Sequence, residues 1–182
     1  IYKINYSSAL VFQKVLFSKQ GESALNYLLK RGLKSEIINQ FQIGYAPSSD
    51  QMKEYFTKNK VTQKLLDQAG NPEKFHRRII FPIKDALGNI VAFTGRAMSD
   101  QQQPKYYNSP ETAIFKKSQV LYGLSEAKQE IKKEGTVIIT EGQMDVIASQ
   151  QSGVKNVVAS SGTAFTEDQL ELMKKTAPDY FP

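Results

Sequence analysis

The chain has 182 residues, a length that suits one large domain or two small ones. It has no cysteine and one histidine, which excludes a disulfide framework and a thiolate zinc site, so any metal site is expected to use oxygen ligands. Lys and Arg outnumber Asp and Glu by 24 to 18, a net charge of +6 that favours a polyanionic partner. No apolar run approaches the about 20 residues that span a bilayer, so we expect a soluble protein without membrane contact.

The first 69 residues are predicted to be mainly helical. Apolar residues recur three and four positions apart in YSSALVFQKVLF, ESALNYLLKRGL, SEIINQF and DQMKEYFTKN, and Gly21 and Gly32 separate the segments. Ser35 and Asp50 are the predicted N-caps. The Leu, Ile and Phe stripes are typical of helices that pack against a core.

From residue 77 the pattern predicts strands instead. RRIIFPI and IVAFTGR read as two strands joined by KDALGN, in which Gly88 and Asn89 can adopt the positive φ of a hairpin turn. Pro82 places its strand at an edge or a bulge. A polar stretch, AMSDQQQPKYYNSPET, and a short amphipathic segment, EAKQEIKKE, follow. We place a domain junction near Lys117, which divides the chain into residues 1–117 and 118–182.

The C-terminal part alternates between strands and helices. Thr166 and Gln169 are spaced as a capping box at the start of the last helix. Short connections between alternating elements indicate a parallel sheet. The fold expected for the whole chain is thus a mixed α+β N-terminal part of helices and a β-ribbon, followed by a parallel α/β unit. The predicted C-terminal elements are strand Thr136–Thr140, helix Gln143–Gln151, strand Asn156–Ala159 and helix Glu167–Lys175.

An acidic turn follows the first of these strands. Glu141 comes directly after a strand that we expect to be buried, Gly142 permits a sharp turn, and Asp145 lies one helical turn on. Ligands of parallel sheets gather at the carboxyl ends of the strands, so this position favours an oxygen-ligand metal site. The alternatives are that Glu141 caps the helix, that Asp145 is a solvated first-turn residue, and that Gly162 marks only a tight turn.

Longer motifs carry a resemblance to a known family. VIITEGQMDVIASQQSGVKNVVASSGTAFTEDQLELM resembles the opening half of a TOPRIM domain of the form found in bacterial DnaG-type primases. PKYYNSPET, followed by IFKK and LYG, resembles the other half of the same catalytic core, and LLKRGL and FQIGYAP match it too. The resemblance covers nearly the whole chain.

The resemblance implies a metal and catalytic role for Glu141, a supporting role for Asp145, and a loop near the metal formed by Gly142, Gly162 and Thr163. The implied cofactor is Mg²⁺ or Mn²⁺, which clustered carboxylates hold against substrate phosphates. In the family the glutamate works with an Asp-x-Asp motif on a later strand. The chain ends before such a strand, so we expect a truncated TOPRIM unit with weak or absent catalysis by itself.

The basic and aromatic residues before the junction suit a track for nucleic acid, because phosphates attract cations and bases stack on aromatic rings. Tyr107 is as readily a core residue, Lys116 a solvated one, and Arg77 a charge at the start of a strand. The family resemblance assigns template or nucleotide contacts to five residues: Arg78, Arg96, Lys105, Tyr106 and Lys117.

By resemblance, the expected function is that of a DNA primase, a DNA-templated RNA polymerase that makes short primers in the bacterial cytoplasm. Its expected partners are a single-stranded DNA template, nucleoside triphosphates, the replicative helicase and single-strand-binding protein, and zinc is expected only in a separate N-terminal domain. Two alternatives remain: another TOPRIM enzyme, such as a topoisomerase or a nuclease, and a non-catalytic module that binds single-stranded nucleic acid.

Overall fold

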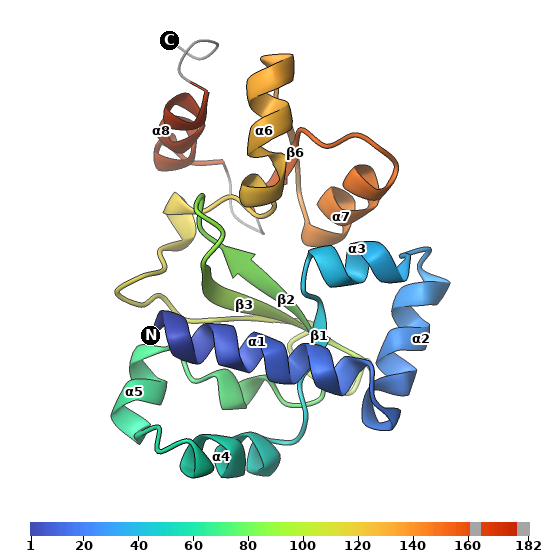
Figure 1. Cartoon of the computed structure of the whole chain (residues 1–182), viewed down its shortest axis with the longest axis vertical. Helices are drawn as coiled ribbons and strands as arrows, with labels where there is room; N and C mark the ends of the chain where they lie inside the picture. Colours follow the sequence, from blue (N-terminus) through green and yellow to red (C-terminus); the bar gives the residue numbers. More distant parts are fainter. Residues whose placement is uncertain (161–164, 178–182) are drawn as a thin grey trace. The chain divides into compact units, whose positions relative to one another are not determined.

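The computed structural model describes residues 1–160 and 165–177. The chain divides into two compact units (Figure 1). The first unit consists of Ile1–Pro82 and Ile90–Ile114, and the second consists of Ile83–Asn89 and Phe115–Pro182. The second unit therefore includes a short segment, residues 83–89, that lies in the sequence between the two stretches of the first unit. Each unit has a hydrophobic core of its own.

The four predicted helical segments of the first unit are confirmed in approximate position, and a fifth helix, α5 (Gln63–Gln68), was not predicted as a segment of its own. Their apolar positions at helical spacing turn one face of each helix toward the interior. The helices are α1 (Tyr2–Leu16), α2 (Glu22–Lys30), α3 (Ser35–Gln40), α4 (Ser49–Lys58) and α5 (Gln63–Gln68), with short 3-10 turns η1 (Lys19–Gly21) and η2 (Pro72–Phe75).

The predicted caps of two helices are wrong. Lys34, not Ser35, is the N-cap of α3. Ser48, not Asp50, is the N-cap of α4, and it forms a capping box in which its hydroxyl accepts from the Gln51 backbone N–H. Ser48 can accept this bond because its backbone is extended, which is the conformation that N-cap residues adopt.

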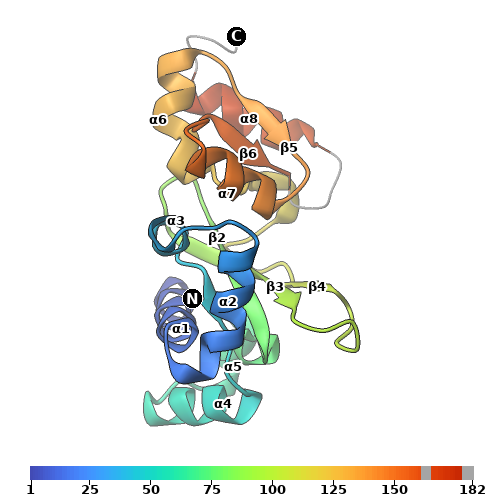
Figure 2. The same cartoon turned by 90° about the vertical axis from the view of Figure 1, so that its right-hand side faces the viewer.

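The first unit also contains a four-stranded sheet in the order β1-β2-β3-β4, of which only the central pair was predicted. β1 pairs antiparallel with β2 through two residues, and β4 pairs antiparallel with β3 through three. Figure 2 shows β3 and β4 side by side. β1 and β4 are too short for a sequence period to reveal. The strands are β1 (Gly44–Tyr45), β2 (Arg78–Lys84), β3 (Ile90–Ala97) and β4 (Tyr106–Asn108).

The connection between β2 and β3 is the predicted turn, with one difference. Gly88 has a φ of 90°, as expected, but Asn89 does not adopt positive φ. The Asp85 carboxylate instead accepts hydrogen bonds from the backbone N–H groups of Leu87 and Asn89, both at 2.9 Å. The prediction that Pro82 places its strand at an edge is wrong for the strand as a whole, since β2 is an inner strand of the sheet. Pro82 is tolerated because it lies beyond Ile80, where the pairing with β1 has ended, so its missing N–H interrupts no bond to β1.

The core of the first unit lies between α1 and the sheet. Phe12 of α1 packs edge-to-face on Phe93 of β3, with ring centroids 5.5 Å apart, and Phe75 packs on the same ring at 5.9 Å. All three phenylalanines are fully buried, and aromatic pairs of this geometry add to the energy of burial. This cluster attaches α1 to the centre of the sheet.

The second unit is the predicted alternation of strands and helices. β5 and β6 are parallel, and the capping box of Thr166 and Gln169 at the start of α8 is confirmed. Its core joins α6, β6 and α8 through Ile131, Val158 and Met173. The elements are the 3-10 turn η3 (Lys117–Gln119), α6 (Leu124–Glu134), β5 (Ile138–Thr140), α7 (Gln143–Gln151), β6 (Val157–Ala159) and α8 (Glu167–Thr176).

β5 differs from the expectation of a buried strand. Ile138 and Ile139 are 45% and 43% exposed, whereas all three residues of β6 are buried. The apolar run therefore predicts the strand correctly but not its surroundings. In the part of the chain that the structure describes, no helix combines the length and the apolar character that a membrane span requires.

The capping box of α4 leads to a test of local stability. Ser48→Ala removes the side-chain acceptor at the N-cap and is expected to lower the free energy of unfolding by about 1 kcal/mol. Asp50→Ala removes only a charge in the first turn and is expected to lower it by about 0.3 to 0.5 kcal/mol. Urea unfolding followed by circular dichroism measures both, and a larger loss for Asp50→Ala contradicts the assignment of the cap.

Candidate nucleic-acid interface and metal site

The acidic turn lies at the carboxyl edge of the two parallel strands. The strand register pairs Thr140 with Ala159, so Glu141 and Ser160 leave the sheet at the same level. Gly142 is the N-cap of α7, which means that neither Glu141 nor Asp145 occupies the cap position. Both carboxylates are exposed. A Cβ at Gly142 would lie 3.4 Å from the Asp145 carboxylate, at van der Waals distance, so this side chain lies directly beside the turn.

The described part of the turn holds two candidate metal ligands rather than a complete set. Within residues 1–160 and 165–177, no group of three or more His, Cys, Asp and Glu side chains is arranged to hold a metal ion. Gly162 and Thr163, the predicted loop near the metal, lie outside the described residues. Two exposed carboxylates beside a strand end are suitable oxygen ligands for Mg²⁺, which usually binds one or two protein carboxylates and keeps several waters.

Arg78 is a buried structural residue in this fold. It is 4% exposed, and its guanidinium donates to the backbone carbonyl oxygens of Pro104 at 2.7 Å and Gln103 at 3.2 Å. Its Cζ lies 5.8 Å from the ring centroid of Tyr107, within the range of a cation–π contact. Burial lowers the pKa of Arg78 from its ordinary value, with Tyr107 acting in the opposite direction. A contact of Arg78 with nucleic acid stays a prediction.

The pairing of β3 with β4 brings Arg96 and Tyr106 together as a basic and aromatic surface. They are opposite each other in the antiparallel register of β3 and β4. The Arg96 Cζ lies 5.9 Å from the Tyr106 ring centroid and 4.6 Å from that of Tyr27 on α2. Tyr106 is 43% exposed and Arg96 is half-buried, so both can be reached from solvent. Tyr107, the next residue, packs on Phe75 in the core, with ring centroids 5.0 Å apart.

The two lysines of the predicted track belong to different units. Lys105 is exposed and directly precedes β4, where its carbonyl oxygen accepts from the Ala97 N–H at 2.8 Å. Its ammonium group therefore extends from the same hairpin as Arg96. Lys117 is exposed at the start of η3 in the second unit, where its carbonyl oxygen accepts from the Gln169 side chain at 3.3 Å.

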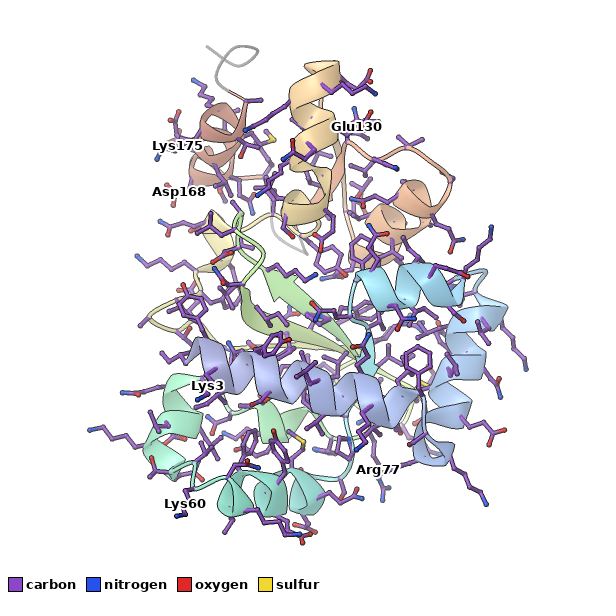
Figure 3. The ribbon with its side chains drawn as sticks, viewed as in Figure 1. Lys3, Lys60, Arg77, Glu130, Asp168 and Lys175 are labelled. Atoms are coloured by element: carbon purple, nitrogen blue, oxygen red, sulfur yellow. The ribbon has the colours of Figure 1, made fainter. Side chains whose placement is uncertain are left out.

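The first unit contains a cavity of about 430 Å³, and no Asp or Glu is among the residues that line it. Arg77 contributes the one permanent charge, and Figure 3 labels its side chain. Arg77 has a φ of 54°, a left-handed conformation that is held by a 2.9 Å bond from its N–H to the Ala46 carbonyl oxygen. Burial raises the pKa of Tyr45 and the nearby Arg77 opposes the shift, which indicates that the two side chains are close. The lining residues are Tyr45, His76, Arg77, Met98, Ser99, Gln101 and Gln102.

Two family models match the chain in sequence order. The DNA primase catalytic core, N-terminal domain, matches residues 11–128, and the Toprim domain matches residues 135–178. The first match alone covers more than half of the chain. The chain belongs to the DNA primase catalytic-core family. The resemblance and the mixed α+β and α/β fold class predicted from the sequence are thereby confirmed.

Relatives and solved structures agree with the family models. The DNA primase of Enterococcus faecalis is 40% identical over 98% of this chain and 31% of the relative, and that of Aquifex aeolicus is 37% identical over 86% and 33%. The chain thus spans about a third of the length of these relatives. The RNA polymerase domain of Mycobacterium tuberculosis primase DnaG, solved with double-stranded DNA, is 31% identical with a TM-score of 0.92 over 99% of this chain and 60% of that one. A DnaG primase catalytic domain bound to ssDNA is 38% identical with a TM-score of 0.88 over 97% and 58%.

Sequence reasoning did not single out Tyr27. Its segment, ESALNYLLKRGL, has the spacing of an ordinary packed helix, and nothing local distinguishes a tyrosine that covers an arginine far along the chain. Arg77 and Arg78 are neighbours in the sequence, but the structure gives them different surroundings. Arg77 is exposed and Arg78 is buried. Alternation along the strand does not separate the two arginines, because Arg77 lies just before β2 and the strand is buried from Arg78 to Ile83.

The burial of Arg78 leads to a stability test. Arg78→Leu leaves the carbonyl oxygens of Gln103 and Pro104 without their donor and is expected to lower the free energy of unfolding by about 2 to 4 kcal/mol. Arg77→Leu is the matched control, since it removes the same charge from an exposed neighbour and is expected to change stability by less than about 0.5 kcal/mol. Calorimetric melting measures both, and equal effects would show that Arg78 has no structural role.

Proposed function

We propose that this chain is the part of a DNA primase that guides single-stranded template and contributes a carboxylate to the catalytic metal site. The observation that carries the proposal is the position of Glu141, directly after β5, at the edge where the carboxyl ends of β5 and β6 lie side by side. Residues 11–128 of the same chain match the primase catalytic core. The reaction would join a nucleotide or primer 3′-hydroxyl to an incoming ribonucleoside triphosphate and release pyrophosphate.

For the nucleic-acid contact, support comes from the β3–β4 hairpin. Arg96, Lys105 and Tyr106 present two cations and an exposed aromatic ring within a short segment. Phosphates would meet the cations, and a base would stack on the ring without regard to its identity. A related DnaG catalytic domain has been solved with ssDNA, at 38% identity to this chain. Arg78 would act indirectly, by fixing the carbonyl groups that precede Lys105. Lys117 of the second unit is proposed as a further contact.

The acidic turn fits a divalent cation. Glu141 and Asp145 are exposed and supply hard oxygen ligands on either side of Gly142. We propose Glu141 as the ligand and Asp145 as its supporting carboxylate, with Gly142, Gly162 and Thr163 as the surrounding loop. A bound Mg²⁺ or Mn²⁺ would neutralise charge on the substrate phosphates. The role of the chain is to hold the carboxylate at a rigid strand end, where the backbone has little freedom.

The match of residues 11–128 favours a primase over other Toprim enzymes, because it covers the part of the chain that lies outside the Toprim domain. For the longer protein we propose cytoplasmic primer synthesis with nucleoside triphosphates as substrates. We propose the replicative helicase and single-strand-binding protein as its partners, and zinc as the ligand of a separate N-terminal domain. The junction near Lys117 is proposed as the boundary between the two functional parts.

The salt dependence of binding tests the track. Arg96→Ala combined with Lys105→Ala is expected to reduce the slope of log K against log salt for single-stranded DNA by about 0.7 for each lost phosphate contact. The matched control is Lys53→Ala with Lys64→Ala, which removes two exposed cations from α4 and α5 and is expected to leave the slope almost unchanged. Fluorescence anisotropy over a salt series measures the slopes, and equal slopes for the two double variants contradict the track.

The metal assignment is tested by Mn²⁺ affinity in a protein of the relatives' full length. Glu141→Gln keeps the size of the side chain but removes its charge, and is expected to weaken Mn²⁺ binding at least about tenfold. Glu167→Gln removes an exposed carboxylate from the first turn of α8 and serves as the control. Electron paramagnetic resonance measures free Mn²⁺. Unchanged affinity in Glu141→Gln favours the alternative of a non-catalytic binding module.

A further inference from the structure

Arg96 lies between two tyrosine rings that come from different elements. Tyr106 is its cross-strand neighbour on β4, and Tyr27 reaches it from α2, with the Arg96 Cζ 4.6 Å from the Tyr27 ring centroid. The contact with Tyr27 is the shorter of the two, since the distance to the Tyr106 centroid is 5.9 Å. Both lie within the about 6 Å over which a guanidinium is attracted to an aromatic face.

The Arg96 Nε is buried and has no hydrogen-bond partner among residues 1–160 and 165–177. Because this N–H is covered, a ligand from solvent can meet the guanidinium only through its terminal Nη groups. A guanidinium is planar, and contact between its face and an aromatic ring leaves the N–H groups in its plane for acceptors. Phosphate oxygens are acceptors of suitable geometry for such a fork of donors.

We propose that Tyr27 is a positioning residue for Arg96. Its ring holds the guanidinium beside Tyr106, so that the terminal Nη N–H groups of Arg96 meet a phosphate of single-stranded nucleic acid. This inference rests on the proposed function, because it takes Arg96 as a phosphate contact. Tyr27 is itself half-buried, and its effect on binding passes through Arg96.

There are two alternatives. Tyr27 could serve only to pack α2 against the core, or it could stack on a base by itself. Its helical neighbour Leu28 is fully buried, so α2 is already attached to the core without the tyrosine ring. An arginine side chain loses rotamer entropy when it binds, and a ring that restricts it beforehand reduces that loss. Removal of the ring should therefore weaken DNA binding only when Arg96 is present.

A double-mutant cycle on single-stranded DNA tests this dependence. Tyr27→Leu is expected to weaken binding roughly three- to tenfold, the size of a cation–π contact, and to have no effect in the Arg96→Ala background. Tyr27→Phe keeps the ring and is expected to bind as the wild type does. Tyr27→Met provides a second ring-free variant if Tyr27→Leu does not fold, and thermal melting checks all of them.

A second measurement needs no DNA. The side-chain Nε–Hε resonance of Arg96 in NMR spectra should shift in Tyr27→Leu, because the ring current is lost, and should stay near its wild-type position in Tyr27→Phe. An unmoved resonance in Tyr27→Leu overturns the contact itself. Equal losses of DNA affinity for Tyr27→Leu with and without Arg96 overturn the positioning role alone. If the wild-type chain binds no single-stranded DNA, the proposed function is contradicted, and so is the contact of Arg96 with a phosphate.

Discussion

The antiparallel register of β3 and β4 decides which side chains of the first unit face solvent. Arg96 is opposite Tyr106, and Gly95 is opposite Tyr107. Because consecutive residues of a strand face opposite sides, Tyr106 is exposed beside Arg96 while Tyr107 packs on Phe75 in the core. A shift of β4 by one residue would turn Tyr107 to solvent and Tyr106 to the core, so the packing of Tyr107 on Phe75 holds the register.

The core and the basic surface are connected through Gly95. A Cβ there would lie 2.7 Å from the Phe75 ring and 2.9 Å from Arg78 Cδ, so only glycine lets both side chains pack this close to β3. Arg78 then reaches the carbonyl groups of Gln103 and Pro104, directly before Lys105. A buried arginine thus holds the backbone from which the exposed lysine and tyrosine extend, which is why a residue without access to solvent affects the candidate site.

The second unit uses strand register in the same way. Parallel pairing of β5 with β6 brings Thr140 and Ala159 level, and this alone places Glu141 beside the start of the next loop. A rigid strand end holds a carboxylate more firmly than a free loop does, which suits a metal ligand. In both units, backbone hydrogen bonds between strands position the candidate functional groups, and the helices supply the buried surface that keeps those strands in place.

The helices, the β2–β3 pair and the parallel alternation around Glu141 were predictable from the sequence, because their periods and turn residues are local signals. The motifs also determined the family, since long runs such as PKYYNSPET are specific in themselves. Only the tertiary structure decided that Arg78 is buried while Arg77 is exposed, that Ser48 rather than Asp50 caps α4, that β5 is open to solvent, and that Tyr27 covers Arg96. A sequence period shows which residues share a face. What covers that face depends on contacts between residues far apart in the chain, which no local pattern contains.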